Sequence, residues 1–230
     1  MRYAIYYTPE ADHPLADAAT RWLGRSVFGA PVATRHEGFA ELKTSPRRYG
    51  FHGTLKAPFR LADAVCEADL VDAFDAFCDA PRPVPHVRLV VGQLGPFFAL
   101  VPEQADENLK TLAADCVTGF EPFRAQLTKA EIAKRKPETL TAPQREYLMR
   151  YGYPYVMDEF RFHMTLTGPV DVVQRDVVAS ALDAHFASVL AHPITMDSLS
   201  IFIERETGQD FDVFRMGKLT QGAHSRAETA

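Results

Sequence analysis

Cysteine is scarce in this sequence, and its arrangement argues against two kinds of site. The chain has three cysteines, Cys66, Cys78 and Cys116, and no pair has Cys-x-x-Cys spacing. An odd number without that spacing argues against a disulfide framework and favours buried free thiols in a reducing compartment. No cysteine stands at a recognisable spacing from a histidine, so a thiol nucleophile is not expected.

The sequence also lacks long apolar runs and an excess of positive charge. No run approaches the roughly 18 apolar residues of a membrane span, and Met1-Arg2 leads into a predicted strand without a signal-peptide pattern. The net charge of −5 argues against a general affinity for nucleic acid. We therefore predict a cytoplasmic protein with neither a membrane nor a long nucleic acid as partner. The oligomeric state is left open.

The clearest positive signal is a nine-residue stretch that occurs twice. The first copy, residues 51–59, reads Phe-His-Gly-Thr-Leu-Lys-Ala-Pro-Phe, and the second, residues 162–170, reads Phe-His-Met-Thr-Leu-Thr-Gly-Pro-Val. Five of the nine positions are identical, and the two histidines lie 111 residues apart. A repeated His-x-Thr is hard to explain by packing alone, so both segments are candidate functional sites.

Similar elements are predicted after each copy. Each copy is followed by a helix, a strand, a turn and a returning strand, at residues 64–80, 84–91, 92–96 and 97–101 in the first half and at 172–190, 194–203, 204–210 and 211–216 in the second. Val173 and Val177 are predicted to lie on the apolar face of the second helix. This match in pattern predicts two copies of one supersecondary unit.

Residues 1–219 are predicted to form one bilobal catalytic domain with one copy of the motif in each lobe. A helical insertion at about 121–150 has no counterpart in the first half, and it carries seven Lys or Arg against four Glu, a local charge of +3. We interpret it either as a solvated helical hairpin or as a lid that brings cations and aromatic rings over a cleft. The polar tail at 220–230 is predicted to be disordered.

Strand geometry predicts which side chains of the motif point together. Residues i and i+2 of a strand share a face. Alternation puts three polar side chains of each copy on one face: His52, Thr54 and Lys56 in the first, and Arg161, His163 and Thr165 in the second. If an approximate two-fold axis relates the halves, both polar faces line one cleft.

These groups suit phosphate-ester chemistry without a metal. One neutral histidine can take a proton from an attacking hydroxyl or water, and the other, protonated, can give one to the leaving oxygen, because the unperturbed pKa of histidine is about 6.5. Thr54 and Thr165 can donate hydrogen bonds to phosphoryl oxygens. Lys56 and Arg161 can offset the charge that develops there.

Other uses of these residues stay open. A two-histidine metal site would have Glu159 as its only nearby carboxylate of matching parity, and zinc usually takes at least three protein ligands, so we expect no metal and no cofactor. Lys56 and Arg161 are alternatively solvated strand ends. Tyr153 and Tyr155 precede the second copy and either contact a base or sugar or belong to the core.

The motifs resemble those of a known superfamily. Two His-x-Thr motifs in two similar halves resemble the two-histidine (2H) phosphoesterases, which include 2′-5′ RNA ligase-like proteins. The longer strings at 48–56 and 151–169 resemble an uncharacterised family encoded in bacterial phosphonate-utilisation operons. The resemblance covers nearly the whole chain. It implies catalytic roles for His52, Thr54, His163 and Thr165, and we add Lys56, Arg161, Tyr49, Tyr153 and Tyr155 as predicted substrate contacts.

The resemblance also implies a fold and an activity. The implied fold is α/β (α+β), with a small antiparallel sheet in each of two pseudo-symmetric lobes, helices on the outer faces and a central cleft. We predict a metal-independent hydrolase of phosphoric diesters that acts on a cyclic phosphodiester of a small sugar phosphate or nucleotide in phosphonate catabolism. Two alternatives stay open: an RNA 2′,3′-cyclic phosphodiesterase or 2′-5′ RNA ligase-like activity, and a non-catalytic protein that binds a phosphorylated metabolite.

Overall fold

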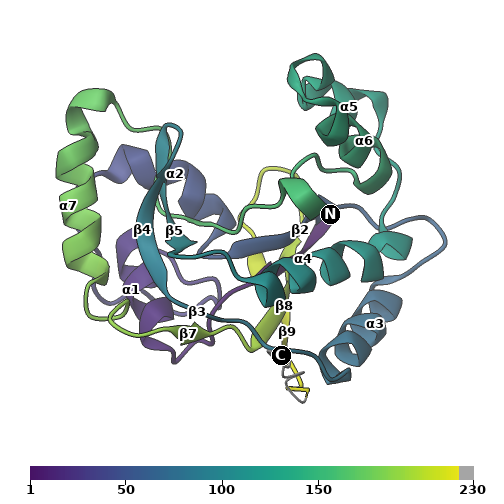
Figure 1. The fold of residues 1–230 in the computed structure, drawn as a ribbon, viewed down its shortest axis with the longest axis horizontal. Helices are drawn as coiled ribbons and strands as arrows, with labels where there is room; N and C mark the ends of the chain where they lie inside the picture. The colour runs from purple at the N-terminus through teal and green to yellow at the C-terminus, as the bar shows by residue number, and fades with distance from the viewer. Residues whose placement is uncertain (223–230) are drawn as a thin grey trace, which may run out of the picture.

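A seven-stranded antiparallel sheet forms the centre of the molecule (Figure 1). The computed structural model describes residues 1–222 of the chain. The strands of the main sheet follow the order β4-β5-β6-β2-β1-β8-β9, and β3 and β7 form a separate two-stranded sheet. The strands are β1 (Arg2–Tyr7), β2 (Gly53–Phe59), β3 (His86–Val87), β4 (Leu89–Leu94), β5 (Phe97–Pro102), β6 (Met164–Thr165), β7 (Ile194–Thr195), β8 (Ser198–Glu204) and β9 (Asp212–Lys218).

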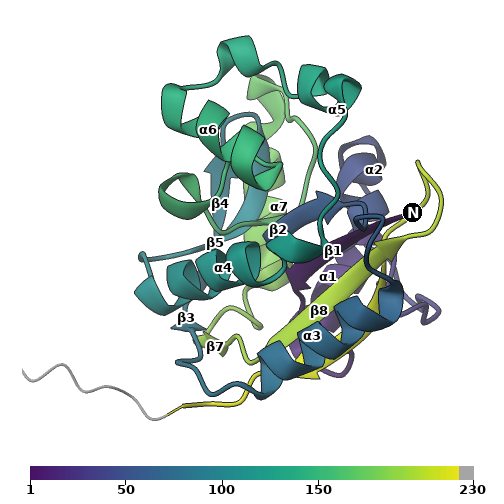
Figure 2. The same ribbon diagram turned by 90° about the vertical axis from the view of Figure 1, so that its right-hand side faces the viewer.

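Helices surround this sheet, and two of them stand apart. Figures 1 and 2 both show α5 and α6, which belong to the predicted insertion, side by side at one end of the molecule. The α-helices are α1 (Pro14–Leu23), α2 (Ala40–Tyr49), α3 (Glu67–Asp79), α4 (Glu107–Gly119), α5 (Lys129–Lys134), α6 (Ala142–Tyr151) and α7 (Arg175–Phe186). Within residues 1–222, no helix is long and apolar enough to cross a bilayer.

The central strand β1 divides the interior into a large and a small core. Its odd-numbered side chains, Tyr3, Ile5 and Tyr7, belong to the large cluster that α1, α3, α4 and α7 cover. Its even-numbered side chains, Ala4 and Tyr6, belong to a small cluster that includes Phe202 and Phe211. The alternation follows from the two-residue period of a strand, and it places Tyr6 on the face where its ring stacks on His52.

The α+β class with antiparallel strands is confirmed, but the prediction of one sheet in each lobe is wrong. The hairpin β4–β5 of the first half joins the motif strand β6 of the second half, and β8–β9 of the second half joins the sheet through β1. The helices cross over in the same way, since α3 packs on β9 and α7 packs on β4. Each half therefore buries its apolar surface against the other, and the two halves share one sheet.

The predicted apolar face of the helix after the second motif needs correction. Val173 and Val177 are exposed, because a 3-10 turn over Val172–Gln174 precedes α7 and turns Val178, Leu182 and Phe186 inward instead. Helix α2 lies in a region for which the sequence pattern predicts no helix or strand.

The tail prediction is partly wrong. Residues 220–222 are held in place, since Arg82 N–H donates to the Thr220 carbonyl at 3.1 Å and Gly222 N–H donates to the Arg82 carbonyl at 2.9 Å. The rest of the predicted tail, 223–230, lies outside the described residues.

Candidate functional site

The two His-x-Thr motifs lie on neighbouring strands. In the antiparallel pair of β2 and β6, Gly53 lies opposite Met164. This register sets His52 opposite Thr165 and Thr54 opposite His163, because antiparallel partners change by one residue in opposite directions. All four of these side chains point to the face opposite Gly53 and Met164. The structure thus brings the two predicted pairs together into one group, the histidine–threonine quartet.

Both imidazoles are held in the same way. The Nδ1 atom of His52 lies 2.9 Å from the Gly50 carbonyl oxygen, and the Nδ1 atom of His163 lies 2.8 Å from the Arg161 carbonyl oxygen. In each case the acceptor belongs to the residue two positions earlier, so Nδ1–H donates and Nε2 stays unprotonated in the neutral ring. Each histidine is therefore oriented by its own backbone, with the Nε2 atom available to a ligand.

The surroundings of His52 are aromatic. Its ring stacks on Tyr6 with a centroid distance of 3.9 Å and an angle of 18° between the planes. Burial lowers the pKa of His52 to about 4, the hydrogen bond to the Gly50 carbonyl opposes this shift, and the charge of His163 adds to it. His52 is therefore neutral near pH 7.

Two adjoining pockets contain the quartet. The first, of about 400 Å³, is lined by His163, Arg161, Tyr155 and other residues of the second motif and the segment before it. The second, of about 270 Å³, is lined by His52 and Thr165 among others. Thr54 and Tyr153 line both pockets, so the two form one cleft along the quartet.

Four of the five predicted substrate contacts lie at this cleft. Arg161 and Tyr155 are exposed and line the first pocket, Tyr49 lines the second, and Tyr153 lies between them. The Tyr49 ring also packs on Phe211 at a centroid distance of 5.2 Å. These positions are compatible with substrate contact, and that role stays a prediction.

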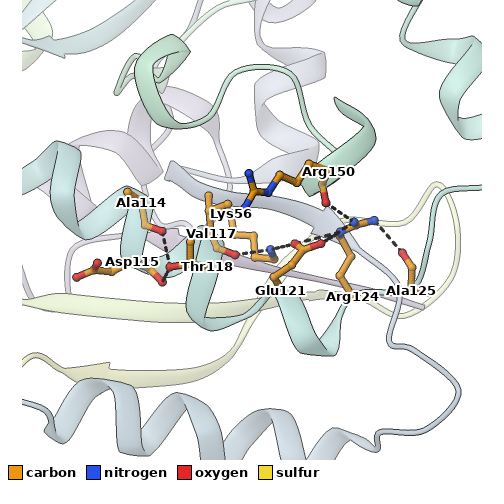
Figure 3. A network of polar contacts seen from close by, with 9 residues as sticks. All are labelled: Lys56, Ala114, Asp115, Val117, Thr118, Glu121, Arg124, Ala125 and Arg150. Atoms are coloured by element: carbon orange, nitrogen blue, oxygen red, sulfur yellow. Dashed lines mark hydrogen bonds and ion pairs between the residues drawn. The ribbon is translucent and has the colours of Figure 1, made fainter. Parts of the chain in front are cut away.

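The prediction for Lys56 is wrong. Its side chain is buried, and its Nζ atom donates to the Glu121 carboxylate at 2.8 Å and to the Val117 carbonyl at 2.9 Å (Figure 3). The cause is a bulge in β2: Ile5 lies opposite Lys56, but the next residue of β1, Tyr6, lies opposite Thr54. The extra residue reverses the alternation, so Lys56 points into the large core with Ile5.

The same network includes the base of the insertion. Arg124, which is also buried, donates to Glu121 at 2.6 Å and to the Arg150 carbonyl at 3.1 Å (Figure 3). A Cβ added at Gly152 would lie 3.0 Å from the Arg124 guanidinium. A buried ion network therefore ties β2 to the end of α6, directly before Tyr153.

Several residues of the cleft escaped the sequence reasoning. Arg2 and Arg135 line the pocket of His52, and Phe97 and Gln144 line the pocket of His163. The positive charge of the insertion was a signal for Arg135, and its presence shows that the insertion forms part of the pocket walls. Nothing in the sequence pattern separates Arg2 or Phe97 from ordinary strand residues.

Metal-binding groups are not clustered in the described part of the chain. Among residues 1–222, no group of three or more His, Cys, Asp or Glu side chains is placed to hold a metal ion. Glu159, the carboxylate considered for such a site, lines the first pocket and accepts a hydrogen bond from Gln144 at 2.8 Å.

A protein-family model matches most of the chain. It covers residues 54–212, more than half of the chain, and its description is "Protein of unknown function (DUF1045)". The chain belongs to this family. The resemblance predicted from the sequence, to an uncharacterised family, is thereby confirmed, and His52 lies just outside the matched range.

Two curated relatives carry the same printed name, "Ribose 1,5-bisphosphate phosphokinase PhnN". The protein from Janthinobacterium sp. (strain Marseille) is 39% identical over 91% of this chain and 49% of its own length. The protein from Laribacter hongkongensis (strain HLHK9) is 30% identical over 94% of this chain and 51% of its own length. The chain thus spans about half the length of the curated relatives it matches.

These names contradict the predicted activity. A phosphokinase is a transferase that moves a phosphoryl group between molecules, whereas the prediction was a hydrolase of cyclic phosphodiesters. The names also support neither of the alternatives, an RNA-directed activity or a non-catalytic metabolite-binding protein. The quartet lies on paired strands, and its catalytic role stays a prediction, but the reaction inferred from it was wrong.

Solved structures with a similar chain course include E. coli LigT. Its complex with NADP+ has a TM-score of 0.44 at 14% identity and covers 96% of this chain and 98% of that one. The apo form has a TM-score of 0.45 at 13% identity with the same coverage. A structure described as a phosphoesterase has a TM-score of 0.42 at 14% identity, over 96% of this chain and 99% of that one. We draw no chemistry from these likenesses.

Proposed function

We propose that the cleft binds a phosphorylated ribose, such as ribose 1,5-bisphosphate, and that the chain supplies the sugar-phosphate site of a phosphokinase in phosphonate metabolism. The observation that carries this proposal is the quartet, in which two imidazoles and two hydroxyls meet on one sheet face inside a pocket. The printed names of the curated relatives support the substrate class.

The quartet offers complementary groups to such a ligand. The neutral His52 ring donates through Nδ1 to the Gly50 carbonyl, so its Nε2 atom accepts a hydrogen bond from a ribose hydroxyl. Thr54 and Thr165 donate hydrogen bonds to phosphoryl oxygens. His163, oriented in the same way by the Arg161 carbonyl, presents its Nε2 atom to the same part of the ligand.

We assign the phosphoryl donor to a different part of these relatives. The sequence contains no Gly-x-x-x-x-Gly-Lys-Ser/Thr segment, the loop that holds nucleotide phosphates in many kinases. The chain spans about half of each relative, so a nucleotide site in the other half is compatible with the printed name. Binding of the sugar phosphate by this chain and binding of the nucleotide outside it together give a phosphokinase.

Calorimetric titration of the purified chain tests this function with two neighbouring threonines as a matched pair. Thr165 belongs to the quartet, whereas Thr167 is buried and accepts a hydrogen bond from the Phe98 N–H at 2.9 Å. Thr165→Val should weaken ribose 1,5-bisphosphate binding about tenfold, the effect of one hydrogen bond to a charged group. Thr167→Val should leave the affinity unchanged and lower stability by about 1 kcal/mol.

The same titration includes two controls. His163→Ala should weaken binding at least as much as Thr165→Val, and ATP should give no heat of binding to the wild-type chain. No binding of ribose 1,5-bisphosphate, or equal effects of the two threonine variants on affinity, would contradict the proposed site. ATP-dependent phosphorylation by this chain alone would contradict the assignment of the nucleotide to another part of the relatives.

A further inference from the structure

A third pocket adjoins the cleft and is more basic than either of the first two. It has a volume of about 580 Å³ and shares Arg2, Pro58 and Arg135 with the pocket of His52. Continuity through these three residues makes it an extension of the cleft. We call it the basic pocket, and its charged lining residues are Arg2, Arg48, Arg60, Lys134, Arg135 and Glu131.

The charge of the basic pocket is not balanced by its own acids. Five cations line it against one carboxylate, and a second carboxylate, that of Glu204, lies beneath it as the partner of two of the arginines. The pocket therefore keeps an excess of three positive charges in a chain whose net charge is −5. Such a local concentration attracts anions and raises their concentration at the site.

The arginines at the floor of the basic pocket are fixed in position. Glu204 is fully buried, binds Arg2 at 2.5 Å on one side and also pairs with Arg48. Burial alone would raise the pKa of Glu204, but the hydrogen bonds from Arg2, from the Gly208 N–H and from Arg48 outweigh it and lower that pKa. In the hydrogen bonds found among residues 1–222, Arg2 donates only through Nε, so its two Nη groups keep their donors for a ligand.

The wall toward the quartet carries two cations without a carboxylate partner among the described residues. Lys134 and Arg135 end α5, and no ion pair within residues 1–222 includes either. The Arg135 guanidinium lies 5.1 Å from the centroid of Tyr153, which lines both pockets of the quartet. A ligand in the cleft can therefore extend past Tyr153 and reach these two charges.

We propose that the basic pocket binds a second phosphate group of the same ligand, while the quartet binds the first. This inference rests on the proposed function and names the chemistry that distinguishes its substrate: a sugar with phosphates at two separated positions. Fixed guanidinium groups suit phosphate because their planar donors match its oxygens. The buried carboxylate of Glu204 holds two of them in place before the ligand arrives.

Titration with three sugar phosphates tests the second site. The wild-type chain should bind ribose 1,5-bisphosphate about tenfold more tightly than either ribose 1-phosphate or ribose 5-phosphate, the effect of one charge-assisted contact. The double variant Lys134→Ala/Arg135→Ala should lose that advantage and bind all three with similar affinity. The advantage should also shrink as salt is raised, since screening weakens exposed charge pairs.

A matched control removes the same charge from the same insertion. Lys129 and Lys136 flank the tested pair and do not line the basic pocket, so Lys129→Ala/Lys136→Ala should change the affinity for the bisphosphate less than twofold. Circular dichroism should show the same helix content and unfolding for both double variants, because all four side chains are exposed and alanine is a good helix former at the two positions inside α5, Lys129 and Lys134.

The outcomes separate the two proposals. Equal wild-type affinity for bisphosphate and monophosphates, or equal loss in both double variants, would overturn the second phosphate site and leave the quartet standing. Failure of all three sugar phosphates to bind would overturn the proposed function first. ATP binding that is lost in Lys134→Ala/Arg135→Ala would overturn the assignment in favour of a nucleotide site.

Discussion

The two copies of the motif share five of nine residues but occupy different surroundings. Residues 53–59 of the first copy form β2, which has seven residues and pairs along its length with β1, while only Met164 and Thr165 of the second copy form a strand, the two-residue β6. His52 stacks on the buried Tyr6 ring at 3.9 Å, whereas the nearest aromatic ring to His163 is Phe97 at 5.9 Å. Similar local sequence thus gives two imidazoles with the same backbone hydrogen bond and unequal aromatic contacts.

The copies differ again at the middle residue of each His-x-Thr. Gly53 and Met164 lie opposite each other, and a Cβ at Gly53 would lie 2.3 Å from the Phe162 ring. The phenylalanine that precedes the second histidine therefore occupies the space that a side chain at 53 would need. The two motifs interlock, and the glycine in one is the consequence of the aromatic ring in the other.

In both copies the alternation of faces stops just after the threonine. In β2 the bulge turns Lys56 into the large core, and in the second copy the strand ends at Thr165, so that Thr167 is buried and bonds Phe98 N–H. Only the histidine and threonine of each copy stay on the cleft side. The comparison teaches that only the histidine and the threonine of each copy face the cleft, and that the residue two positions after the threonine, Lys56 or Thr167, has a structural role.

Removal of the Glu121 carboxylate should have the largest effect. Glu121→Ala leaves two buried cations, Lys56 and Arg124, without their shared partner, and we expect a loss of about 4 kcal/mol in the free energy of unfolding. Lys56→Met should cost less than half as much, because Arg124 still neutralises Glu121. Urea denaturation measures both.

Ligand titration of Lys56→Met then decides its role. A structural lysine predicts unchanged affinity for ribose 1,5-bisphosphate at 25 °C in the folded variant. If Lys56→Met instead kept full stability and lost affinity, the first motif would extend beyond its threonine and the comparison above would fail.

The pH dependence of stability should expose the burial of His52. Its pKa falls from the ordinary 6.5 to about 4 on folding, so between these values the unfolded chain binds a proton that the folded chain does not. Stability from this group is complete above pH 6.5 and is lost as the pH falls toward 4, by up to about 3 kcal/mol. His52→Gln should remove this part of the slope in denaturant titrations.

A histidine outside the site provides the control for that slope. His192 is exposed, and His192→Gln should leave the difference in stability between pH 6.5 and pH 4 as it is in the wild type. Burial also lowers the pKa of His36, so the comparison of each variant with the wild type, rather than the absolute slope, isolates His52. A slope that is unchanged in His52→Gln would show that the ring is well solvated.

A methyl group at position 53 should have a smaller effect. Gly53→Ala places its Cβ against the Phe162 ring, and we expect a loss of about 2 kcal/mol in stability from overpacking. In a Phe162→Leu background the same change should cost much less, because the ring is gone. The double-mutant cycle measures this coupling, and additive losses would show that the two motifs do not interlock at this point.

The predictable part of the site was the part fixed by local alternation. Strand parity over three residues placed His52 with Thr54 and His163 with Thr165, and the structure keeps both pairs on one face. The same alternation gave the wrong face for Lys56, two residues further on, because β2 has a bulge there. A bulge depends on how β1 pairs with β2, which local alternation does not include. The insertion contributes Arg135 and Gln144 to the pocket walls, in line with one part of the lid interpretation. Closure of the insertion over the cleft stays a prediction.

The sequence by itself determined that two His-x-Thr strands exist and that both histidines follow a strand pattern, because these features depend on residues close in the chain. Only the tertiary structure decided that the strands are neighbours, that Lys56 is part of a buried ion network, and that Arg2, Arg48, Lys134 and Arg135 meet in a basic pocket. Those residues are up to 133 positions apart. Their meeting follows from the burial of apolar surface between two interlocked halves, which no local pattern encodes.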